Sequence, residues 1–232
     1  MLRMLVSAYY VFFVGVLLPA LCVRSYFRLK TGAPFPGKPR IFLQTLVMHA
    51  LLFALAFFTW RAFDLPLLPP YAVAVKDLAL GLVTLVVFVG CMYPLWKRKV
   101  AAKDERTYRI MPKSAGELRW WAAVSLSAGF VEEIVYRGVL FGILIYWLKN
   151  WWAAAILCAL VFAVSHSIQG WKSAVIIFFI SLAFQGMVYV NGTLYVAMAV
   201  HAIYDFIAGV AYMRLWKQVG PGSLPVQQTA PA

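Results

Sequence analysis

The sequence predicts an all-α protein that crosses a membrane several times, as a bundle of about seven, or alternatively eight, transmembrane helices. Of its 232 residues, 64% are hydrophobic and 12% are charged, whereas a soluble domain carries about 25% charged residues. The apolar residues form runs close to or above the ~20 residues of a transmembrane helix. Most Lys and Arg residues lie between these runs. This distribution is typical of a polytopic membrane protein with one compact domain.

Three apolar runs and two basic loops make up the first half of the chain. The runs at 5–23, 41–60 and about 72–96 each predict one transmembrane helix. The loop at 24–40 carries five Lys or Arg residues and no acid, and its Gly and Pro residues predict a non-helical segment. The loop at 97–119 carries eight Lys or Arg residues against three acids. Because two helices separate these loops, we expect both at the same face of the membrane.

Four more apolar runs make up the second half. Residues 120–148 are apolar over more length than one span needs, so we expect an interfacial turn at the beginning of this run and a transmembrane helix after it. The runs at 151–169, 173–190 and 194–213 predict three further helices. The residues after 219 are rich in Pro, Gly and Gln, a composition that predicts disorder.

We divide this one membrane domain into three segments. Residues 1–114 hold the N-terminal helices and the basic loops, residues 115–214 form a helical core, and residues 215–232 form a disordered tail. Basic loops favour the cytoplasmic side of a membrane. We therefore expect the N-terminus outside and the C-terminus inside, and the short loops favour a bacterial cytoplasmic membrane.

The net charge of +13 raises the question of a nucleic-acid partner. The basic residues lie between hydrophobic runs, where the cytoplasmic side of the membrane and its anionic lipids explain them. We therefore expect anionic lipid headgroups at the basic loops and no nucleic acid as a partner.

Six polar residues lie inside three successive apolar runs of the second half. A charged side chain near the centre of a bilayer costs at least about 2.5–3.5 kcal/mol on insertion scales, so such residues persist where they have a partner or a function. Each of the six alone has a structural interpretation, whereas six together indicate a functional site. They are Glu132, Glu133, Arg137, His166, His201 and Asp205.

The spacing of these residues predicts which of them pair within a helix. Glu133 and Arg137 are four residues apart with the acid first, which favours an ion pair. Glu132 points about 100° away from Glu133 and is free to face another group. His201 and Asp205 are also four residues apart and share one face. We therefore expect Glu133 to be held in an ion pair and Glu132 to be available to another group.

The remaining histidine, His49, lies in the middle of the run at 41–60. Buried polar groups are almost always hydrogen-bonded. We interpret His49 as structural, paired with a backbone carbonyl or with a neighbouring helix.

The six residues fall into three ordered motifs. These are Glu132-Glu133-x-x-x-Arg137, Phe162-x-x-x-His166 and His201-x-x-x-Asp205. In this order they resemble the motifs of the CAAX-protease and bacteriocin-processing (CPBP, or Abi) family of intramembrane endopeptidases, over roughly residues 115–214. The resemblance implies that this segment is a catalytic core, which hydrolyses a peptide bond of a membrane-embedded or membrane-anchored protein or peptide.

The resemblance also implies a role for each motif. Peptide hydrolysis needs an activated water, a group that stabilises the oxyanion and a proton donor for the leaving amine. Glu132 is then the general base, with His166 beside it on the same water, and His201 donates to the oxyanion. Glu133 and Arg137 fix the helix and the electrostatics around Glu132.

Asp205 stands where some members of the family have Asn and others have Asp. An amide has a hydrogen-bond donor for the oxyanion, whereas an ionised carboxylate has none. Two interpretations stay open: Asp205 is protonated in its apolar setting, or it orients His201 as the main donor.

A metal-dependent mechanism is the alternative. Glu132, His166 and His201 make a set of two histidines and one carboxylate that could hold a catalytic zinc ion with an open position. We favour the metal-free, glutamic mechanism without a cofactor, on the resemblance alone.

Two other classes of function are also alternatives. One is a proton- or ion-coupled membrane transporter, for which intramembrane Glu, His and Arg residues are equally typical. The other is a non-catalytic membrane immunity or scaffold protein. The order and spacing of the three motifs favour the peptidase, because transport has no reason to require them.

A further expectation concerns how deep the two motif histidines lie in the membrane. His201 lies about 20 Å from the end of its run at Arg214, at 1.5 Å per residue, whereas His166 lies much nearer the end of its own run. The two can meet only through tilted or broken helices or across a cavity. We expect a water-filled cavity open to the cytoplasmic half, because hydrolysis needs water and charged residues tolerate the membrane when they line one.

Overall fold

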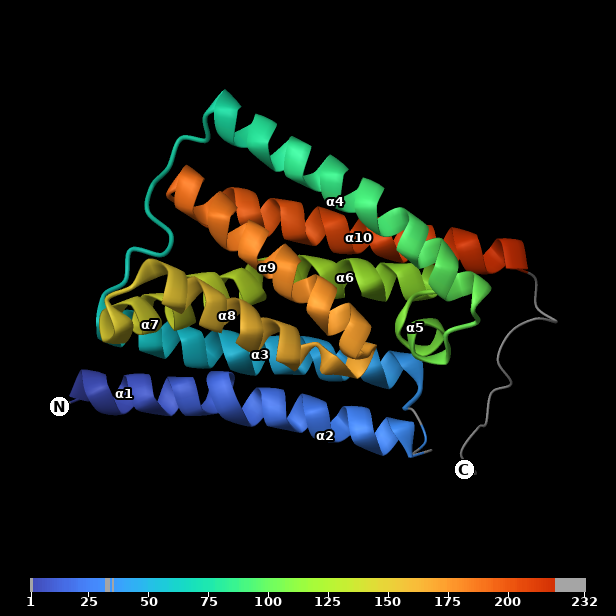
Figure 1. Cartoon of the computed structure of the whole chain (residues 1–232), viewed down its shortest axis with the longest axis horizontal. Coiled ribbons are helices and arrows are strands. Elements are labelled where there is room, and N and C mark those ends of the chain that lie inside the picture. The colour runs from blue at the N-terminus through green and yellow to red at the C-terminus, as the bar shows by residue number, and fades with distance from the viewer. Residues whose placement is uncertain (1, 32–33, 35, 220–232) are drawn as a thin grey trace.

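The computed structural model describes residues 2–31, 34 and 36–219. Within that part of the chain every regular element is helical and no strand occurs, which confirms the all-α class. The described helices form seven segments that run side by side between two ends of the molecule (Figure 1). These segments are α1 (Leu2–Tyr10) with η1 (Val11–Leu17) and α2 (Leu18–Lys30); α3 (Lys38–Phe63); α4 (Val75–Ala101); α6 (Ala115–Glu132) with η2 (Glu133–Leu140) and α7 (Phe141–Leu148); α8 (Trp151–Ser165); α9 (Trp171–Asn191); and α10 (Tyr195–Val219). The short helices α5 (Glu105–Ile110) and η3 (Ser167–Gln169) lie in the connections.

Five of the described helical segments are long and apolar enough to cross a membrane, so the protein is an integral, multi-pass membrane protein. The predicted count of seven or eight transmembrane helices is not confirmed. The segment from α6 to α7 carries charged residues at its centre, and α8 has 15 residues, fewer than the ~20 that cross a bilayer. The five are Leu2–Lys30, Lys38–Phe63, Val75–Ala101, Trp171–Asn191 and Tyr195–Val219.

The two basic loops are shorter than predicted. Residues 24–30 continue α2, and α3 begins at Lys38 with Pro39 in its first turn. The prediction that all of 24–40 is non-helical is therefore wrong, because proline fits the first turn of a helix, where the N–H groups have no partner within the helix. In the second loop α4 continues to Ala101 and α5 forms a further turn.

The boundaries of the second half also differ from the prediction. No interfacial turn precedes the run at 120–148: α6 begins at Ala115, and the helix continues through η2 and α7. Trp121 is buried, and its indole N–H donates to the backbone carbonyl of Asp205 on α10 at 2.8 Å. The predicted disordered tail at 215–232 overlaps α10, which continues to Val219, and residues 220–232 lie outside the described part.

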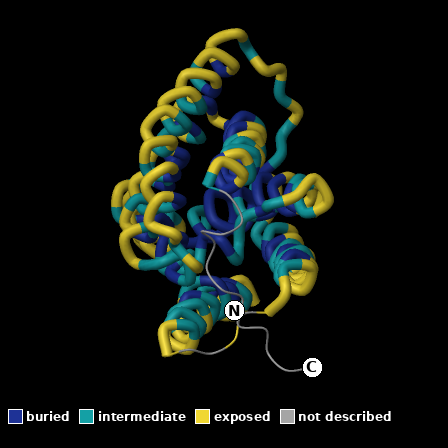
Figure 2. Tube along the Cα trace, turned by 90° about the vertical axis from the view of Figure 1, so that its right-hand side faces the viewer, coloured by how far each residue is buried: buried dark blue, intermediate teal, exposed yellow. Residues whose placement is uncertain are grey.

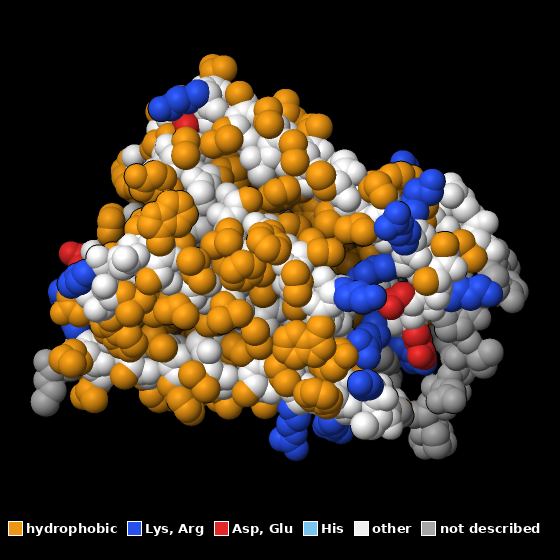
Figure 3. Space-filling model, viewed as in Figure 1, with side chains coloured by type: hydrophobic (Ala, Val, Ile, Leu, Met, Phe, Trp, Pro, Cys, Tyr) orange, Lys and Arg blue, Asp and Glu red, His pale blue; other side chains and the backbone are white. Residues whose placement is uncertain are grey.

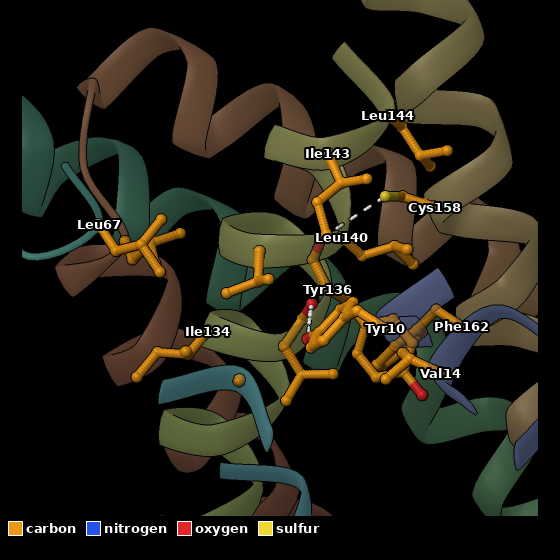
Figure 4. Close-up of a cluster of buried hydrophobic side chains, with 14 of the residues drawn as sticks. Tyr10, Val14, Leu67, Ile134, Tyr136, Leu140, Ile143, Leu144, Cys158 and Phe162 are labelled. Atoms are coloured by element: carbon orange, nitrogen blue, oxygen red, sulfur yellow. Dashed lines mark hydrogen bonds between the residues drawn. The ribbon is translucent and has the colours of Figure 1, made fainter. Parts of the chain in front are cut away.

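The largest apolar core lies where the first segment, η2 and α8 meet (Figure 4). It includes Tyr10 and Val14 from the first segment, Ile134 and Leu140 from η2, and Phe162 from α8, each at most 5% exposed. Burying a large apolar side chain contributes about 1.5–3 kcal/mol. The core therefore fixes η2, the helical stretch that carries the first polar motif, against the N-terminal helices.

The outer surface has the character of a protein surrounded by lipid. Leu82 and Val86 of α4 and Phe179 of α9 are more than 60% exposed, and exposed residues follow the outer helices in Figure 2. Lys and Arg gather at one end, which we call the basic end, where α2, α4 and α10 finish and α3 begins (Figure 3). Apolar flanks with basic residues at one end fit a membrane protein whose basic end lies at one surface of the bilayer.

Candidate active site

The first polar motif lies at the start of a π-helical stretch. Glu132 is the last residue of α6, and Glu133 is the first residue of η2. A π-helix departs from the i→i−4 ladder and occurs often at functional sites. Two backbone carbonyls of η2 accept side-chain hydrogen bonds: Val135 from the Tyr10 hydroxyl at 2.9 Å, and Tyr136 from the Cys158 thiol at 3.5 Å (Figure 4). The helices α1 and α8 therefore satisfy the irregular backbone that presents the motif.

Glu133 lies in a closed polar cluster. Its side chain is 0% exposed, and its Oε1 accepts hydrogen bonds from Arg137 Nη1 at 3.1 Å and from His201 Nδ1 at 2.7 Å. Because a carboxylate only accepts, His201 carries a proton on Nδ1. Glu133 therefore joins η2 to α10 and fixes the orientation of the His201 ring.

Arg137 ties two more helices to this cluster. Its Nη2 donates to Ser181 Oγ of α9 at 2.8 Å. Its guanidinium lies 4.3 Å from the centre of the Phe162 ring and 5.5 Å from that of Phe184, which are cation–π distances. The buried positive charge is thus compensated by one carboxylate, one hydroxyl and two aromatic faces.

Glu132 shares His201 with Glu133 and has two further histidine neighbours. Its Oε1 lies 3.3 Å from His49 Nε2. Its Oε2 lies 3.8 Å from His166 Nε2 and 3.8 Å from His201 Nε2. This Oε2 atom is buried and has no hydrogen-bond partner among the described residues. The structure therefore brings the carboxylate and three histidines together, on four different helices.

His166 follows the end of α8 and is its C-cap residue. Its Nδ1 lies 2.8 Å from the carbonyl oxygen of Phe162. Because a carbonyl only accepts, Nδ1 carries a proton, and the other ring nitrogen, Nε2, faces Glu132 Oε2. Its side chain is partly exposed.

Asp205 lies one turn after His201 on α10. Its Oδ2 is 3.7 Å from His201 Nε2, and its side chain is partly exposed. The six predicted site residues therefore lie in one cluster, with Glu132 and His201 at its centre.

Two cavities meet at this cluster. The first, of about 150 Å³, lies between α4, α9 and α10 and is lined at its inner end by His166, His201 and Asp205. The second, of about 510 Å³, lies between α2, α3 and α8 and is lined by Glu132 and His49 as well as His166. Both extend to the basic end, the first at Lys99 and Thr107 and the second at Arg28 and Pro34.

The geometry explains how the two motif histidines meet. The helix α8 has 15 residues, and His166 is its C-cap residue. The helices α6 and α10 also approach closely. A Cβ atom at Gly129 would lie 2.6 Å from the carbonyl oxygen of Met198 and 2.7 Å from the nitrogen of Ala202. Only glycine permits this contact. Met198 and Ala202 lie before and after His201 along α10.

Sequence reasoning missed several residues of the site. The prediction that His49 pairs with a backbone carbonyl or a neighbouring helix is confirmed for the helix, at Ser127 of α6, but its contact with Glu132 was not predicted. Ser127 of α6, Ser181 and Phe184 gave no signal, because serine and phenylalanine are ordinary in membrane helices. Their contacts with His49 and Arg137 depend on packing between helices that are distant in the sequence.

The alternative zinc site was tested against the side chains present. Among residues 2–31, 34 and 36–219, no group of three or more His, Cys, Asp or Glu side chains is arranged to hold a metal ion. The set of Glu132, His166 and His201 does not fit a zinc ion as placed, and we derive no step through one.

These features define a class of protein: a polytopic helical membrane protein whose buried carboxylate and histidines meet at cavities that open to one end. Residues 114–207 match a family model described as type II CAAX prenyl endopeptidase Rce1-like. The match confirms the resemblance to the CAAX-protease family that the three motifs predicted, and it includes all six predicted site residues; the members of this family are proteases. No curated protein and no solved structure matches the chain. His49 and the rest of the first 113 residues lie outside the matched segment.

Proposed function

We propose that the protein is an intramembrane endopeptidase in which Glu132 activates water to hydrolyse a peptide bond of a membrane-anchored substrate. One observation carries the proposal. Glu132 Oε2 is buried without a hydrogen-bond partner in the described chain and lies 3.8 Å from two histidine nitrogens, and Glu132 lines the second cavity beside His166, which lines both cavities. A carboxylate oxygen in such a place is suited to accept a proton from a water molecule.

The first step is the attack of water on the substrate carbonyl. Glu132 Oε2 takes one proton of the water, whose second contact is His166 Nε2. The water oxygen bonds to the carbonyl carbon, and the electron pair of the C=O bond moves to the oxygen. The tetrahedral intermediate then carries a negative charge that needs a hydrogen-bond donor.

His201 is the proposed donor to this oxyanion. Its Nδ1–H is used by Glu133, so only a doubly protonated ring has a second proton on Nε2, which faces the site. Carboxylates of Glu133, Asp205 and Glu132 lie at 2.7, 3.7 and 3.8 Å from the ring nitrogens and compensate this charge. In the last step the C–N bond breaks, and the amine nitrogen takes the proton that Glu132 received.

The proposed substrate class is a peptide attached to the membrane. The first cavity has apolar walls, including Leu95, Ile176 and Ile180, from helices whose outer faces are apolar. This is a suitable path for an apolar chain that enters from the bilayer. The description of the matched family makes a prenylated CAAX peptide the first substrate to test.

The test uses the purified protein in lipid nanodiscs and an internally quenched, farnesylated CAAX peptide, with the same peptide without its farnesyl group for comparison. Wild type should cleave the farnesylated peptide. Glu132→Gln should lose at least about 100-fold in kcat, because the general base is removed without a change of shape. Glu105→Gln is the matched control: Glu105 forms a surface ion pair with Arg109, and its loss should leave kcat within about twofold.

A second arm finds the substrate if the probe peptide is not cleaved. Membrane peptides from cells that express wild type or Glu132→Gln are compared by mass spectrometry. Uncleaved peptides that accumulate only with Glu132→Gln identify the substrate. If no peptide differs, the peptidase is rejected in favour of a transporter or a non-catalytic scaffold.

We also propose that the basic end faces the cytoplasm, which places the N-terminus outside and brings Lys and Arg to anionic headgroups. Single cysteines are introduced into a protein whose Cys22, Cys91 and Cys158 are replaced. Cysteines at Gly37 and Ala102 should be protected from an impermeant reagent added outside the cell, and one at Gly192 should react. Labelling at Ala102 from outside would reverse the orientation.

A further inference from the structure

His49 contacts the proposed base from outside the matched segment. It lies in the middle of α3, is 6% exposed, and has two side-chain partners on α6. Its Nδ1 is 2.8 Å from Ser127 Oγ, and its Nε2 is 3.3 Å from Glu132 Oε1. Both ring nitrogens are therefore directed at polar atoms of the helix that presents the first motif.

The contacts of His49 allow its Nε2 to carry a proton directed at Glu132. The Ser127 hydroxyl lies 2.8 Å from His49 Nδ1 and 2.9 Å from the carbonyl oxygen of Val124. Because a hydroxyl both donates and accepts, it can pair with Nδ1 whether or not Nδ1 carries a proton. A proton on Nε2 then forms a hydrogen bond to the carboxylate oxygen Oε1, whereas a ring protonated on Nδ1 alone would direct a lone pair at this oxygen, which is repulsive.

We propose that His49 is a positioning residue for Glu132: its Nε2–H holds Oε1, so that Oε2 is directed at the space between His166 and His201. The proposal rests on the proposed function, because it assigns Glu132 the role of an ionised base. It makes the N-terminal helices a part of the catalytic unit rather than only its support. Without His49, the carboxylate of Glu132 can rotate about its Cγ–Cδ bond. Oε2 is then no longer held toward the space between His166 and His201.

Other titratable groups surround the pair, from every neighbouring element. Among the described residues, a contact with Glu132 Oε1 is found for His49, so the interaction with Oε1 is assigned to His49. The surrounding groups are Cys22 of the first segment, Glu133, Tyr136 and Arg137 of η2, His166 after α8, and His201 and Asp205 of α10.

The first experiment reads the protons of His49 without any substrate. The chain has three histidines, so the protein labelled with ¹⁵N-histidine in nanodiscs gives few imidazole signals in NMR, and His49→Gln identifies those of His49. Wild type should show a proton on His49 Nε2. In Glu132→Gln the signal of this nitrogen should shift, because its acceptor changes from a carboxylate to an amide. A His49 ring with its proton on Nδ1 alone, or an Nε2 signal that Glu132→Gln leaves unchanged, would overturn the proposal.

The second experiment measures kcat and KM on the peptide that wild type cleaves. His49→Leu removes the contact and should lower kcat by about 10- to 100-fold, the range for partners that orient a catalytic group, with KM nearly unchanged. His49→Gln keeps an N–H donor near Oε1 and should recover most of this loss. The control is Thr59→Val on the same helix, since Thr59 is buried and bonds only its own helix, at the Leu55 carbonyl.

The outcomes separate a positioning role from a structural one, and this proposal from the proposed function. If His49→Leu lowers kcat only in proportion to the amount of folded protein, or if His49→Gln is as inactive as His49→Leu, His49 does not position Glu132. If wild type cleaves no peptide, the proposed function fails. The NMR experiment still decides whether His49 Nε2–H contacts Glu132.

Discussion

Glu132 and Glu133 are neighbours in the chain, yet the regions around them are built differently. Glu133 is fully buried, lines neither cavity, and binds both Arg137 and His201 through Oε1. Glu132 lines the second cavity, and its Oε2 lies 3.8 Å from two histidine nitrogens. The Oε2 atoms of both residues are buried without a direct hydrogen bond in the described chain, so the two differ in their cavity and in the partners of Oε1. A buried carboxylate whose charge is compensated by an arginine serves the fold. A carboxylate at a cavity, only partly compensated, is available for chemistry.

The largest expected effects come from exchanging each carboxylate for its amide. Glu132→Gln should abolish cleavage with a nearly unchanged melting temperature. Glu133→Gln leaves the charge of Arg137 buried and uncompensated, which costs about 3–5 kcal/mol. We therefore expect lower expression, a lower melting temperature and lower activity. Activity assays and thermal unfolding of both variants in the same detergent test this difference.

The comparison fails if the two variants behave alike. Equal losses of stability would show that both carboxylates serve the fold. A Glu132→Gln protein with more than a few per cent of wild-type kcat would remove Glu132 from the role of base.

The next largest effect is expected from widening the close contact between α6, which carries Glu132, and α10, which carries His201. Gly129→Ala places a Cβ atom against the backbone of Met198 and Ala202, and overpacking of this kind costs about 1–3 kcal/mol. Because the clash pushes α10 from α6, the contact of His201 with Glu133 should lengthen and kcat should fall. Gly186→Ala in α9 is the control: its Cβ has nothing within 4 Å, so stability should stay equal or rise.

The contrast also explains how much of the molecule could be predicted from the sequence. Apolar runs identify helices because hydropathy is a property of each segment alone, whereas helix ends depend on details such as Pro39 in the first turn of α3. Spacing along one helix predicted the contact of Glu133 with Arg137. The contact of Glu133 with His201 spans 68 positions, and no local pattern encodes it.

The part that could not be predicted is mostly irregular backbone and packing between helices. The π-helical η2 begins in the motif itself, and its carbonyls depend on Tyr10 and Cys158 from other helices. The contacts of His49 with Ser127 and Glu132 could not be predicted, because they form only when α3 packs on α6.

A smaller effect is expected from changing Asp205, whose side chain is partly exposed and lines the first cavity. Its carboxylate can donate to the oxyanion only while protonated, so any such contribution is lost as the pH rises, whereas an amide donates at every pH. Asp205→Asn should therefore keep kcat within a few-fold and extend the pH optimum upward. Measured pH–rate profiles test this. A loss of activity at every pH would instead assign Asp205 to orienting His201 through its charge.

The smallest expected effect is that of metal removal, which tests whether the open region around Glu132 is a metal site. If Glu132, His166 and His201 bound zinc, active protein would carry about one metal ion per chain, strong chelators would remove both metal and activity, and added Zn²⁺ would restore them. We expect cleavage to survive exhaustive chelation, because the proposed base and oxyanion donor are side chains of the protein. Metal content by mass spectrometry and activity are measured on the same sample, with Glu132→Gln as the inactive reference. If zinc and activity were lost and restored together, Glu132 would be a zinc ligand, and the metal-free mechanism would be wrong.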